Sequence, residues 1–455
     1  MLERIKKLLK GGTKEQGERN DQPTESSFDN VLKNREEADK KKNIKKHREQ
    51  CIELAMKEMG WTRKEAVDDL NEMKERLGIK YTEYRRYHFF EIPKEKQAER
   101  LKEIRDFKEL RSNTQSDGNK EHIAEIAEIT GWTKDKVREE IAKARELCGA
   151  TVKDYWAFQF YDLTPEEQKT FLTQKASNVM SKYYDTNDFY RDILLNKELS
   201  NKVFDEFLHR PWGINQEISF EEFKDKFGDS GKVLYKPLNG HGGLGITLFT
   251  FNDEDIKEKY EQIKGMSRAI LEGFVDQHHD LKALNPASVN TLRVVTVSRS
   301  LDGDPAHKDY FNVCYAALRI GRGGSVVDNA SSGGLISGID LETGQLITDA
   351  VSTSGDMYTH HPDTGVCFKG FKIPMFKEAL ELVKEAGMLI DGYTGWDVAI
   401  SEDGPVLIEA NIMPGNRILE TPFIKDTMKR EPGQRTGHRY IMEKYLREAE
   451  AALKE

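Results

Sequence analysis

A glycine-rich loop between two expected strands limits the folds open to this chain. The stretch KPLNGHGGLGI carries G-x-G-x-x-G at Gly240, Gly242 and Gly245. KVLY before it and ITLFTF after it are rich in β-branched and aromatic residues, which predicts a strand on each side. A Rossmann fold or a P-loop needs a helix directly after the glycines, so both are excluded. The loop predicts either a flap whose backbone N–H groups hold a polyphosphate or a hairpin without a ligand.

The position of the nearest lysine distinguishes this loop from the glycine-rich loop of protein kinases. Lys236 stands just before the loop. Protein kinases carry the corresponding lysine on the strand after the loop, and they also contain H-R-D and D-F-G tripeptides, which this sequence lacks. The pattern therefore argues against a protein kinase.

Composition excludes several functional classes. The 455 residues suffice for roughly two or three domains. The formal net charge of −9 argues against nucleic acid as a partner, and no apolar run approaches the ~20 residues of a membrane span. The N-terminus lacks a signal-peptide pattern. The four cysteines stand far apart, which indicates reduced thiols, and we expect a cytoplasmic protein.

The N-terminal part divides into a tail and a helical region. Residues 1–40 are predicted to be a flexible tail. Residues 1–10 have an apolar helical face among basic side chains, which predicts either a short docking helix or frayed terminus, or weak peripheral contact with an anionic membrane. Residues 41–175 follow a helical period throughout.

An internal repeat lies within residues 41–175. Gly60-Trp61-Thr62 recurs as Gly131-Trp132-Thr133, and the match continues without a gap. In each copy a threonine is placed to cap a helix and a glycine to end it. An aromatic cluster follows, which could stack a ligand ring but is expected to form the core of each copy. The paired aromatic positions are Tyr84 and Tyr155, Tyr87 and Phe158, and Phe89 and Phe160.

The remaining sequence predicts an α+β region over residues 176–425, followed by a C-terminal helix over residues 426–455, whose last stretch, residues 435–455, is expected to face solvent. A helical pattern covers residues 376–389. Between such helices the sequence predicts a largely antiparallel sheet. The expected strands read KVLYKP, ITLFTF, AILEGFV, NTLRVVTVS, NVCYAALRI, WDVAIS and PVLIEAN.

The last two of these strands predict a metal site. Glu402-Asp403-Gly404 between them is a hairpin-turn signal. Glu409 and Asn411 are two residues apart and share one face, and Asp397 can lie opposite either of them. Three oxygen ligands would then converge, which suits Mg²⁺. The alternative is a polar hairpin whose carboxylates are solvated.

The order of these parts resembles the ATP-grasp superfamily, and more closely its sugar-transfer-associated branch. The resemblance covers about residues 150–420. It implies an α+β ATP-grasp fold in which two α+β lobes grip ATP, preceded here by an all-helical N-terminal region with an internal repeat. The segments that carry it are Lys236-Pro237 with the loop to Gly245, Gln277-His278, Ser288 to Val294, Asp328-Asn329, Gly333-Gly334, His361 to Gly365, Gly395 to Asp397, and Glu409 to Asn411.

The resemblance implies an ATP site with Mg²⁺. Lys236 and Lys197 would bind phosphates, and AILEGFV would be the hinge between the lobes. The loop residues over the phosphates would be Asn239, Gly240, Gly242 and Gly243. Backbone groups near Glu272, Phe274 and Val275 would meet adenine, with His278 near the ribose. The implied metal ligands are Asp397, Glu409 and Asn411.

The resemblance also implies the reacting groups. Arg293 and Arg319, together with Lys236, would stabilise the phosphoryl group during transfer. Because Arg293 lies within an expected buried strand, it needs an anionic partner, and for both arginines the alternative is a salt bridge to a protein carboxylate. Near the substrate carboxylate the resemblance places Asn290, Asn329, Gly333 and Gly334.

The implied activity is ATP-dependent carboxylate–amine ligation through an acyl-phosphate. The substrates would be a small-molecule or sugar-linked carboxylate and an amine acceptor, and a place in polysaccharide biosynthesis comes only from the family name. One alternative is a phosphotransferase acting on a small molecule or sugar, and another is a non-catalytic nucleotide-binding scaffold. Arg417 and Glu420 stand where the resemblance leads us to expect a glutamine, so the acceptor side departs from the pattern.

Overall fold

The computed structural model describes residues 44–185, 187–238, 245–300, 310–324, 333–352 and 355–453. The chain divides into two compact units, Met1–Leu110 and Arg111–Glu455, and each is described by itself. The expected tail over residues 1–40, with its membrane-contact alternative, lies outside the described residues. So do five expected site residues: Asn239, Gly240, Gly242, Gly243 and Asn329.

The first unit is helical. A helix over residues 44–59 leads to α3 (Arg63–Leu77), α4 (Tyr81–Arg86), the short η1 (Phe89–Glu91) and the beginning of α5 (Lys94–Thr130). Thr62 caps α3 by accepting from the Glu65 N–H, and Gly78 ends it with a φ of 60°. Tyr84 and Phe89 are fully buried in the core of this unit, and Tyr87 packs against it, as the sequence predicted.

The second unit begins with the same series of elements, 71 residues further along the chain. They are α6 (Lys134–Cys148), α7 (Val152–Ala157) and η2 (Phe160–Asp162), followed by α8 (Pro165–Gln168). Thr133 caps α6, and Gly149 ends it with a φ of 75°. The expected aromatics of this copy, Tyr155, Phe158 and Phe160, lie in its core.

Each copy contains a buried glutamine that forms the same pair of hydrogen bonds. Gln97 donates from Nε2 to the carbonyl oxygens of Phe89 and Ile92. Gln168 donates to the equivalent carbonyls of Phe160 and Leu163 at 3.0 and 3.2 Å. The sequence similarity therefore extends to caps, glycine turns and side-chain hydrogen bonds.

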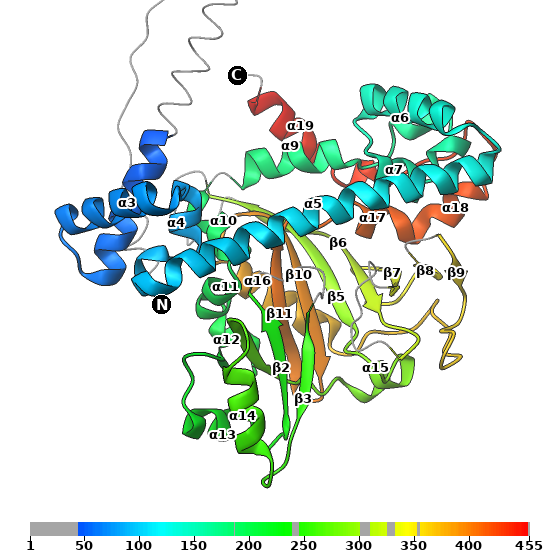
Figure 1. Ribbon diagram of the computed structural model, residues 1–455. Helices are drawn as coiled ribbons and strands as arrows, with labels where there is room; N and C mark the ends of the chain where they lie inside the picture. Colours follow the sequence, from blue (N-terminus) through cyan, green and yellow to red (C-terminus); the bar gives the residue numbers. More distant parts are fainter. Residues whose placement is uncertain are drawn as a thin grey trace, which may run out of the picture. The chain divides into compact units, whose positions relative to one another are not determined.

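A four-stranded antiparallel sheet forms the first α+β part of the second unit (Figure 1). Its apolar face packs with α13 (Phe220–Phe227) and α14 (Ile256–Lys264). It follows the short helices α10 (Asp188–Leu195), α11 (Lys197–Val203) and α12 (Asp205–Leu208). In spatial order the strands are β1 (Trp212–Ile214), β4 (Ala269–Gly273), β2 (Lys232–Pro237) and β3 (Thr247–Thr250).

A seven-stranded antiparallel sheet forms the second α+β part. One region of it packs with α9 (Gln174–Tyr184), and α16 (Phe376–Gly387) contacts four of its strands. Its described strands, in spatial order, are β11 (Gly404–Ile412), β10 (Gly392–Ser401), β5 (Thr291–Arg299), β6 (Tyr310–Ile320), β7 (Leu335–Ile339), β8 (Ala350–Ser352) and β9 (Met357–Tyr358). All seven strands expected from sequence are present, and the sheets are antiparallel as predicted.

The C-terminal segment differs from the expectation. The helical region after the sheet contains α17 (Arg417–Glu420), η5 (Thr421–Phe423), α18 (Ile424–Met428) and η6 (Arg439–Ile441) before the final α19 (Glu443–Ala452). The solvent-facing prediction for the last helix was wrong, since Leu446 and Ala449 are fully buried in a core shared with α9. Leu446 and Ala449 are three residues apart and therefore lie on one face of α19, which packs against the core that includes α9.

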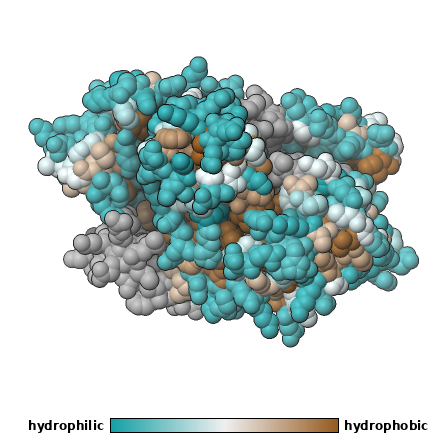
Figure 2. Space-filling model, turned by 90° about the horizontal axis from the view of Figure 1, so that it is seen from below, coloured by the Kyte–Doolittle hydropathy of each residue, from teal (hydrophilic) through white to brown (hydrophobic). Residues whose placement is uncertain are grey.

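The described surface carries scattered apolar side chains. Tyr440 and Ile129 are the most exposed of the large ones, at 68% and 62%. Hydrophilic residues cover most of the face in Figure 2, with hydrophobic residues between them in separate groups. Within the described ranges, no helix has the length and apolar character needed to cross a membrane.

Candidate active site

The carboxylate of Glu272 lies buried among cations in the four-stranded sheet. Leu234 pairs with Glu272, so Lys236, two residues along β2, lies on the same face as Glu272. The Lys236 Nζ donates to the Glu272 Oε2 at 2.6 Å, Arg210 donates to the same oxygen at 2.7 Å, and Asn201 donates to Oε1 at 3.1 Å. Burial raises the pKa of Glu272, but the charges of Arg210 and Lys236 outweigh it and hold that pKa well below its usual range.

Lys197 brings a second lysine to this cluster from α11. The Asn196 side chain caps α11 by accepting from the Glu198 N–H at 3.0 Å. This cap places Lys197 at the first position of the helix. The Lys197 Nζ donates to the Pro237 carbonyl oxygen at 3.2 Å. Burial lowers the pKa of Lys197, while the Glu409 carboxylate opposes that shift. Lys197 therefore lies within electrostatic reach of both the β2 lysine and the β11 glutamate.

Arg210 connects the two sheets and was not anticipated from sequence. Besides Glu272 on β4, its guanidinium donates to the carbonyl oxygens of Leu407 and Ile408 on β11. These bonds join the strand that carries Glu272 to the strand that carries Glu409. Its only sequence signal is a basic residue before Pro211 and a short strand, a pattern too common to indicate such a role.

Asp397 lies opposite Glu409 in the antiparallel hairpin, and Gly395 lies opposite Asn411. A β-bulge follows directly after Asp397, a feature common beside functional sites. The strands thus bring the three expected metal ligands together, and the Asn411 Nδ2 donates to the Asp397 Oδ2 at 3.3 Å. Their role toward a metal stays a prediction.

The buried Asp397 carboxylate is engaged by both arginines expected at the site. Arg293 donates from Nε to Oδ1 and from Nη2 to Oδ2, the latter at 3.0 Å, and Arg319 donates to Oδ2 at 2.8 Å. Counting the bond from Asn411, three of these donors reach Oδ2 and one reaches Oδ1. Burial raises the pKa of Asp397, but both arginines outweigh it and lower that pKa overall. The salt-bridge alternative for Arg293 and Arg319 is therefore present in the structure.

Glu409 and Asn411 have oxygens that the protein leaves available. Within the described part of the chain, the Glu409 carboxylate and the Asn411 amide oxygen accept no hydrogen bond. Both are half-buried and sit on the same face of β11. Oxygen donors of this kind fit Mg²⁺, which needs only one or two carboxylates when a nucleotide supplies the rest. Among the described residues only the Arg293 Nε donates to the Asp397 Oδ1, so that oxygen could join them.

The connection between the two sheets contains the expected adenine and ribose residues. Phe274 and Val275 directly follow β4, and Val275 packs against Ala399 and Val406 of the hairpin. The Lys232 Nζ lies 5.3 Å from the centre of the Phe274 ring. His278 caps the short α15 (His279–Leu284). A connection that is anchored on one sheet and leads into the other suits a hinge.

The residues expected near the substrate carboxylate lie in two separate parts of the second unit. Asn290 is fully buried and donates to the Gln277 Oε1 and the Leu281 carbonyl at 3.0 Å each, so its amide holds the connection together. Gly333 and Gly334 precede β7, and the Gly333 carbonyl accepts from the Arg322 Nε at 2.6 Å. No contact joins Asn290 to these two glycines among the described residues.

The departure at Arg417 and Glu420 has a structural cause. Glu420 is buried and accepts from the Leu172 and His438 N–H groups, at 2.7 and 2.9 Å. Asn416 donates to Asp154 and to the Leu172 carbonyl, and Arg417 lies 3.8 Å from the Asp154 carboxylate. These residues therefore join the segment after β11 to the second helical copy and do not face a substrate pocket in the described structure.

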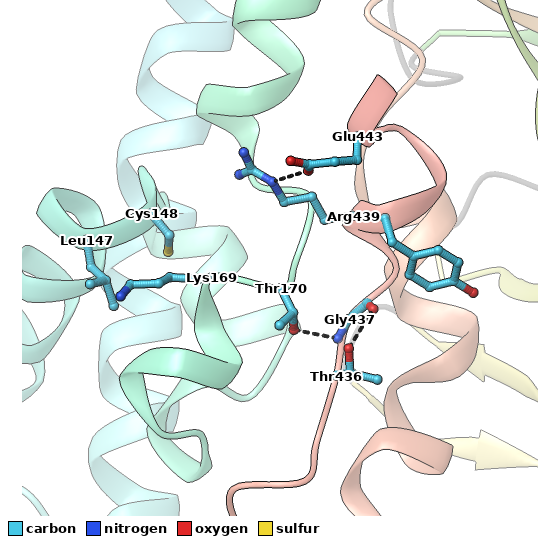
Figure 3. Close-up of a pocket in the computed structure, with 9 residues that line it drawn as sticks. Leu147, Cys148, Lys169, Thr170, Thr436, Gly437, Arg439 and Glu443 are labelled. Carbon is cyan, nitrogen blue, oxygen red and sulfur yellow. Dashed lines mark hydrogen bonds and ion pairs between the residues drawn. The ribbon is translucent and has the colours of Figure 1, made fainter. Parts of the chain in front are cut away.

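A separate cavity lies away from these residues. It has a volume of about 450 Å³ and lies beside the contact between Thr170 and Gly437, where the Gly437 N–H donates to the Thr170 Oγ1 at 2.7 Å (Figure 3). None of the expected site residues lines it. This cavity is therefore separate from the clusters around Glu272 and Asp397.

Comparison with known proteins agrees with this geometry. A family described as "Sugar-transfer associated ATP-grasp" matches residues 175–424, more than half of the chain. A search of curated proteins finds no match.

Among solved structures the chain is similar to the ADP complex of PurK, an N5-carboxyaminoimidazole ribonucleotide synthetase (13% identity, 49% of this chain and 46% of that one, TM-score 0.30). It is also similar to D-alanyl-alanine synthetase A from Vibrio cholerae (14% identity, 58% of this chain and 65% of that one, TM-score 0.32). The chain thus spans less than two thirds of either protein. The family match and the two α+β parts agree on one conclusion: this chain belongs to the sugar-transfer-associated ATP-grasp family.

Proposed function

We propose that the protein is an ATP-dependent ligase that joins a carboxylate to an amine through an acyl-phosphate. One observation carries the proposal. Where the two sheets meet, five cationic side chains gather with three carboxylates and leave two positive charges in excess. The cations are Lys197, Arg210, Lys236, Arg293 and Arg319, and the carboxylates are Glu272, Asp397 and Glu409. A partly buried surplus of positive charge attracts a polyphosphate.

The chain's own residues would divide the binding of ATP between the two sheets. Lys236 and Lys197 would hold phosphates on the side of the small sheet, and the connection at Phe274 and Val275 would meet the adenine. Glu409 and Asn411 would hold Mg²⁺, which neutralises phosphate charge during transfer. Glu272 orients Lys236 through their 2.6 Å hydrogen bond.

The reaction proceeds in two balanced steps. An oxygen of the substrate carboxylate attacks the γ-phosphorus of ATP, which forms an acyl-phosphate and releases ADP. The amine then attacks the acyl carbon, so that an amide forms and phosphate leaves with the oxygen that came from the carboxylate. Arg293 and Arg319, held in place by Asp397, would stabilise the charge of the transferring phosphoryl group.

A substrate screen tests the proposal. The full chain with ATP and Mg²⁺ is offered sugar acids and amino acids singly and in pairs, in a cytoplasm-like buffer, and phosphate and ADP are both measured. A ligase gives full phosphate release only when a carboxylate and an amine are present together. The family name gives sugar-linked carboxylates, as used in polysaccharide biosynthesis, the first place in the screen.

The same screen identifies the outcomes that would overturn the proposal. ADP formed with a single acceptor and without free phosphate would indicate a phosphotransferase. Nucleotide binding without any ADP across the screen would indicate a scaffold. For an active pair, ¹⁸O placed in the substrate carboxylate should appear in the released phosphate, because that oxygen leaves with it. Its absence from phosphate would exclude the acyl-phosphate.

A further inference from the structure

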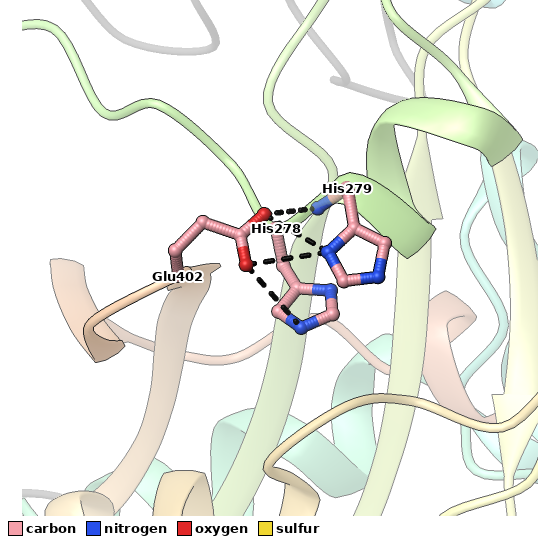
Figure 4. A group of neighbouring side chains, drawn as sticks. All are labelled: His278, His279 and Glu402. Carbon is pink, nitrogen blue, oxygen red and sulfur yellow. Dashed lines mark hydrogen bonds and ion pairs between the residues drawn. The ribbon is translucent and has the colours of Figure 1, made fainter.

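The geometry points to a second metal site, of the zinc class, formed by His278, His279 and Glu402. It lies where the connection after β4 reaches the tip of the β10–β11 hairpin (Figure 4). Glu402 is five residues from Asp397 along the hairpin, which corresponds to roughly 15 Å of extended chain. The site is thus distinct from the oxygen ligands expected to hold Mg²⁺, and it does not depend on the proposed activity.

Two imidazole nitrogens face one carboxylate at this site. The His279 Nδ1 lies 3.0 and 3.2 Å from the two oxygens of Glu402, and the His278 Nε2 lies 3.7 Å from the Glu402 Oε2. One ligand atom from each of the three residues lies within 4.8 Å of the others. The two rings are stacked with their centres 4.1 Å apart, and both turn toward Glu402 in Figure 4. An ion between these atoms would need only small movements of the side chains.

A second carboxylate lies behind the histidines. The Asp280 Oδ2 is 3.6 Å from the His278 Nδ1, and the Asp280 Oδ1 is 3.5 Å from the His279 Nε2. One carboxylate therefore faces the outer nitrogen of both rings while the inner nitrogens face Glu402. At these distances the Asp280 carboxylate forms no hydrogen bond with either ring, but a small movement of its side chain would place an acceptor at an outer nitrogen, as metal-binding histidines commonly have.

Binding would change one existing contact. The His278 Nδ1 now accepts from the Asp280 N–H at 3.2 Å. With an ion on Nε2, this nitrogen would carry the proton and donate to the Asp280 carboxylate instead. The Asp280 N–H then loses this acceptor, but it belongs to an exposed residue at the start of α15, where water can accept from it.

The ligand set selects the metal. Two imidazoles and one carboxylate, with a fourth position open to water, form a common three-residue set for Zn²⁺. Mg²⁺ prefers oxygen ligands and would compete poorly here. The expected ion is therefore Zn²⁺ or a close relative such as Co²⁺.

The site would fasten the connection to the hairpin. Backbone contacts already join them, since the His278 N–H donates to the Ile400 carbonyl at 2.7 Å and the His279 N–H donates to Glu402 at 2.8 Å. An ion added to these contacts would hold together the segment after Glu272 and the hairpin that carries Glu409.

Metal titration of the full chain tests the site. The protein is first freed of metal with a chelator and then titrated calorimetrically with Zn²⁺, without nucleotide or Mg²⁺, and Co²⁺ serves as a spectroscopic probe. We expect one ion per chain and the visible absorption of tetrahedral Co²⁺. His279→Ala and Glu402→Gln should each weaken binding at least tenfold, and Asp280→Asn should weaken it about 10- to 100-fold.

A matched control and the opposing results complete the experiment. His360→Ala removes an exposed histidine whose ring nitrogen lies 3.0 Å from the Thr359 Oγ1, and the variant should bind Zn²⁺ like the wild type. Equal Zn²⁺ affinity in the wild type and in the His279→Ala/Glu402→Gln double variant would overturn the site, as would ready displacement of Zn²⁺ by Mg²⁺. Glu402→Gln preserves side-chain shape, so the test remains decisive should His279→Ala fail to fold.

Discussion

Asp397 and Arg293 are direct cross-strand partners on β10 and β5, and the Arg293 Nη2 lies 3.0 Å from the Asp397 Oδ2. Arg319 reaches the same carboxylate from β6. Three adjacent strands thus place one buried carboxylate against two guanidiniums. Burial of one anion with two cations leaves a positive charge that an anionic ligand can neutralise.

Asp397→Asn should therefore remove both activity and stability. The variant leaves two partly buried arginines without their carboxylate, so we expect the free energy of unfolding to fall by about 3–5 kcal/mol and ATP turnover to be lost. Urea denaturation and ADP release measure the two effects. Asp403→Asn, at the exposed tip of the same hairpin, is the control and should change neither. Undiminished turnover in the Asp397 variant would refute its place in the site.

Lys236→Ala should weaken nucleotide binding. A charge-assisted hydrogen bond contributes about 1.5–3 kcal/mol, so the dissociation constant for ADP should rise about ten- to hundredfold. Arg210 still pairs with Glu272 in the variant, which limits the loss of stability. Calorimetric titration with ADP measures the change, and Lys224→Ala, an exposed lysine on α13, serves as the control. Equal ADP affinity in both variants would contradict the assigned role.

Asp185 should make stability depend on pH between about pH 4 and 6. Burial raises the pKa of Asp185 to about 6, although Ser181 and the Tyr393 N–H donate to it. A carboxyl whose pKa is raised by folding stabilises the fold below its unfolded pKa, near 3.9, and this contribution is lost as pH rises through 6.

Asp185→Asn should remove this dependence. From pH 4 to pH 7 the stability of the variant should rise relative to the wild type by about 2 kcal/mol, because the pKa shift is about two units and the unfolded carboxyl is already half ionised at pH 4. Urea unfolding across this pH range provides the measurement. Parallel stability curves for the two proteins would show that Asp185 stays ionised at low cost.

The two equivalent glycines of the helical copies should respond unequally to alanine. Both Gly78 and Gly149 have a positive φ, which costs an alanine about 1–2 kcal/mol. A Cβ at Gly78 meets no atom within 4 Å, whereas at Gly149 it would lie 2.3 Å from Lys175 side-chain atoms. Gly149→Ala should therefore destabilise its own copy more than Gly78→Ala does.

Amide hydrogen exchange can measure the local stability of each copy separately. Peptides from α3 and α6 should exchange faster in the respective variants, with the larger increase in α6. Gly118→Ala, inside α5 where a Cβ meets nothing, is the control and should not speed exchange. An equal or larger effect at Gly78 would contradict the packing described around Gly149.

The strands and the shared face of Glu409 and Asn411 could be predicted because they depend on local alternation and on the turn at Glu402-Asp403-Gly404. The sequence left open whether Asp397 faces Glu409 or Asn411, and the β-bulge after Asp397 decides for Glu409. The aromatic cores of the two helical copies were predictable for the same reason: each copy must bury its own apolar side chains.

The side-chain partners at the site could not be predicted in this way. Arg210 reaches β11 carbonyls about 200 positions away, and its neighbours in sequence give no sign of that contact. The buried bonds of Glu420 to Leu172 and His438 likewise depend on how distant segments pack. Such pairings follow from tertiary structure and not from periodicity.

The Mg²⁺ dependence of ATP binding tests the central claim most directly. If Glu409 on β11 holds the ion while Lys197 and Lys236 hold the phosphates, wild-type protein should bind ATP more tightly with Mg²⁺ than without it. Glu409→Gln should lose that difference and keep its Mg²⁺-free affinity, whereas Asp403→Asn should retain the full difference. A Glu409→Gln protein that still gains the wild-type increase in ATP affinity from Mg²⁺ would contradict the account.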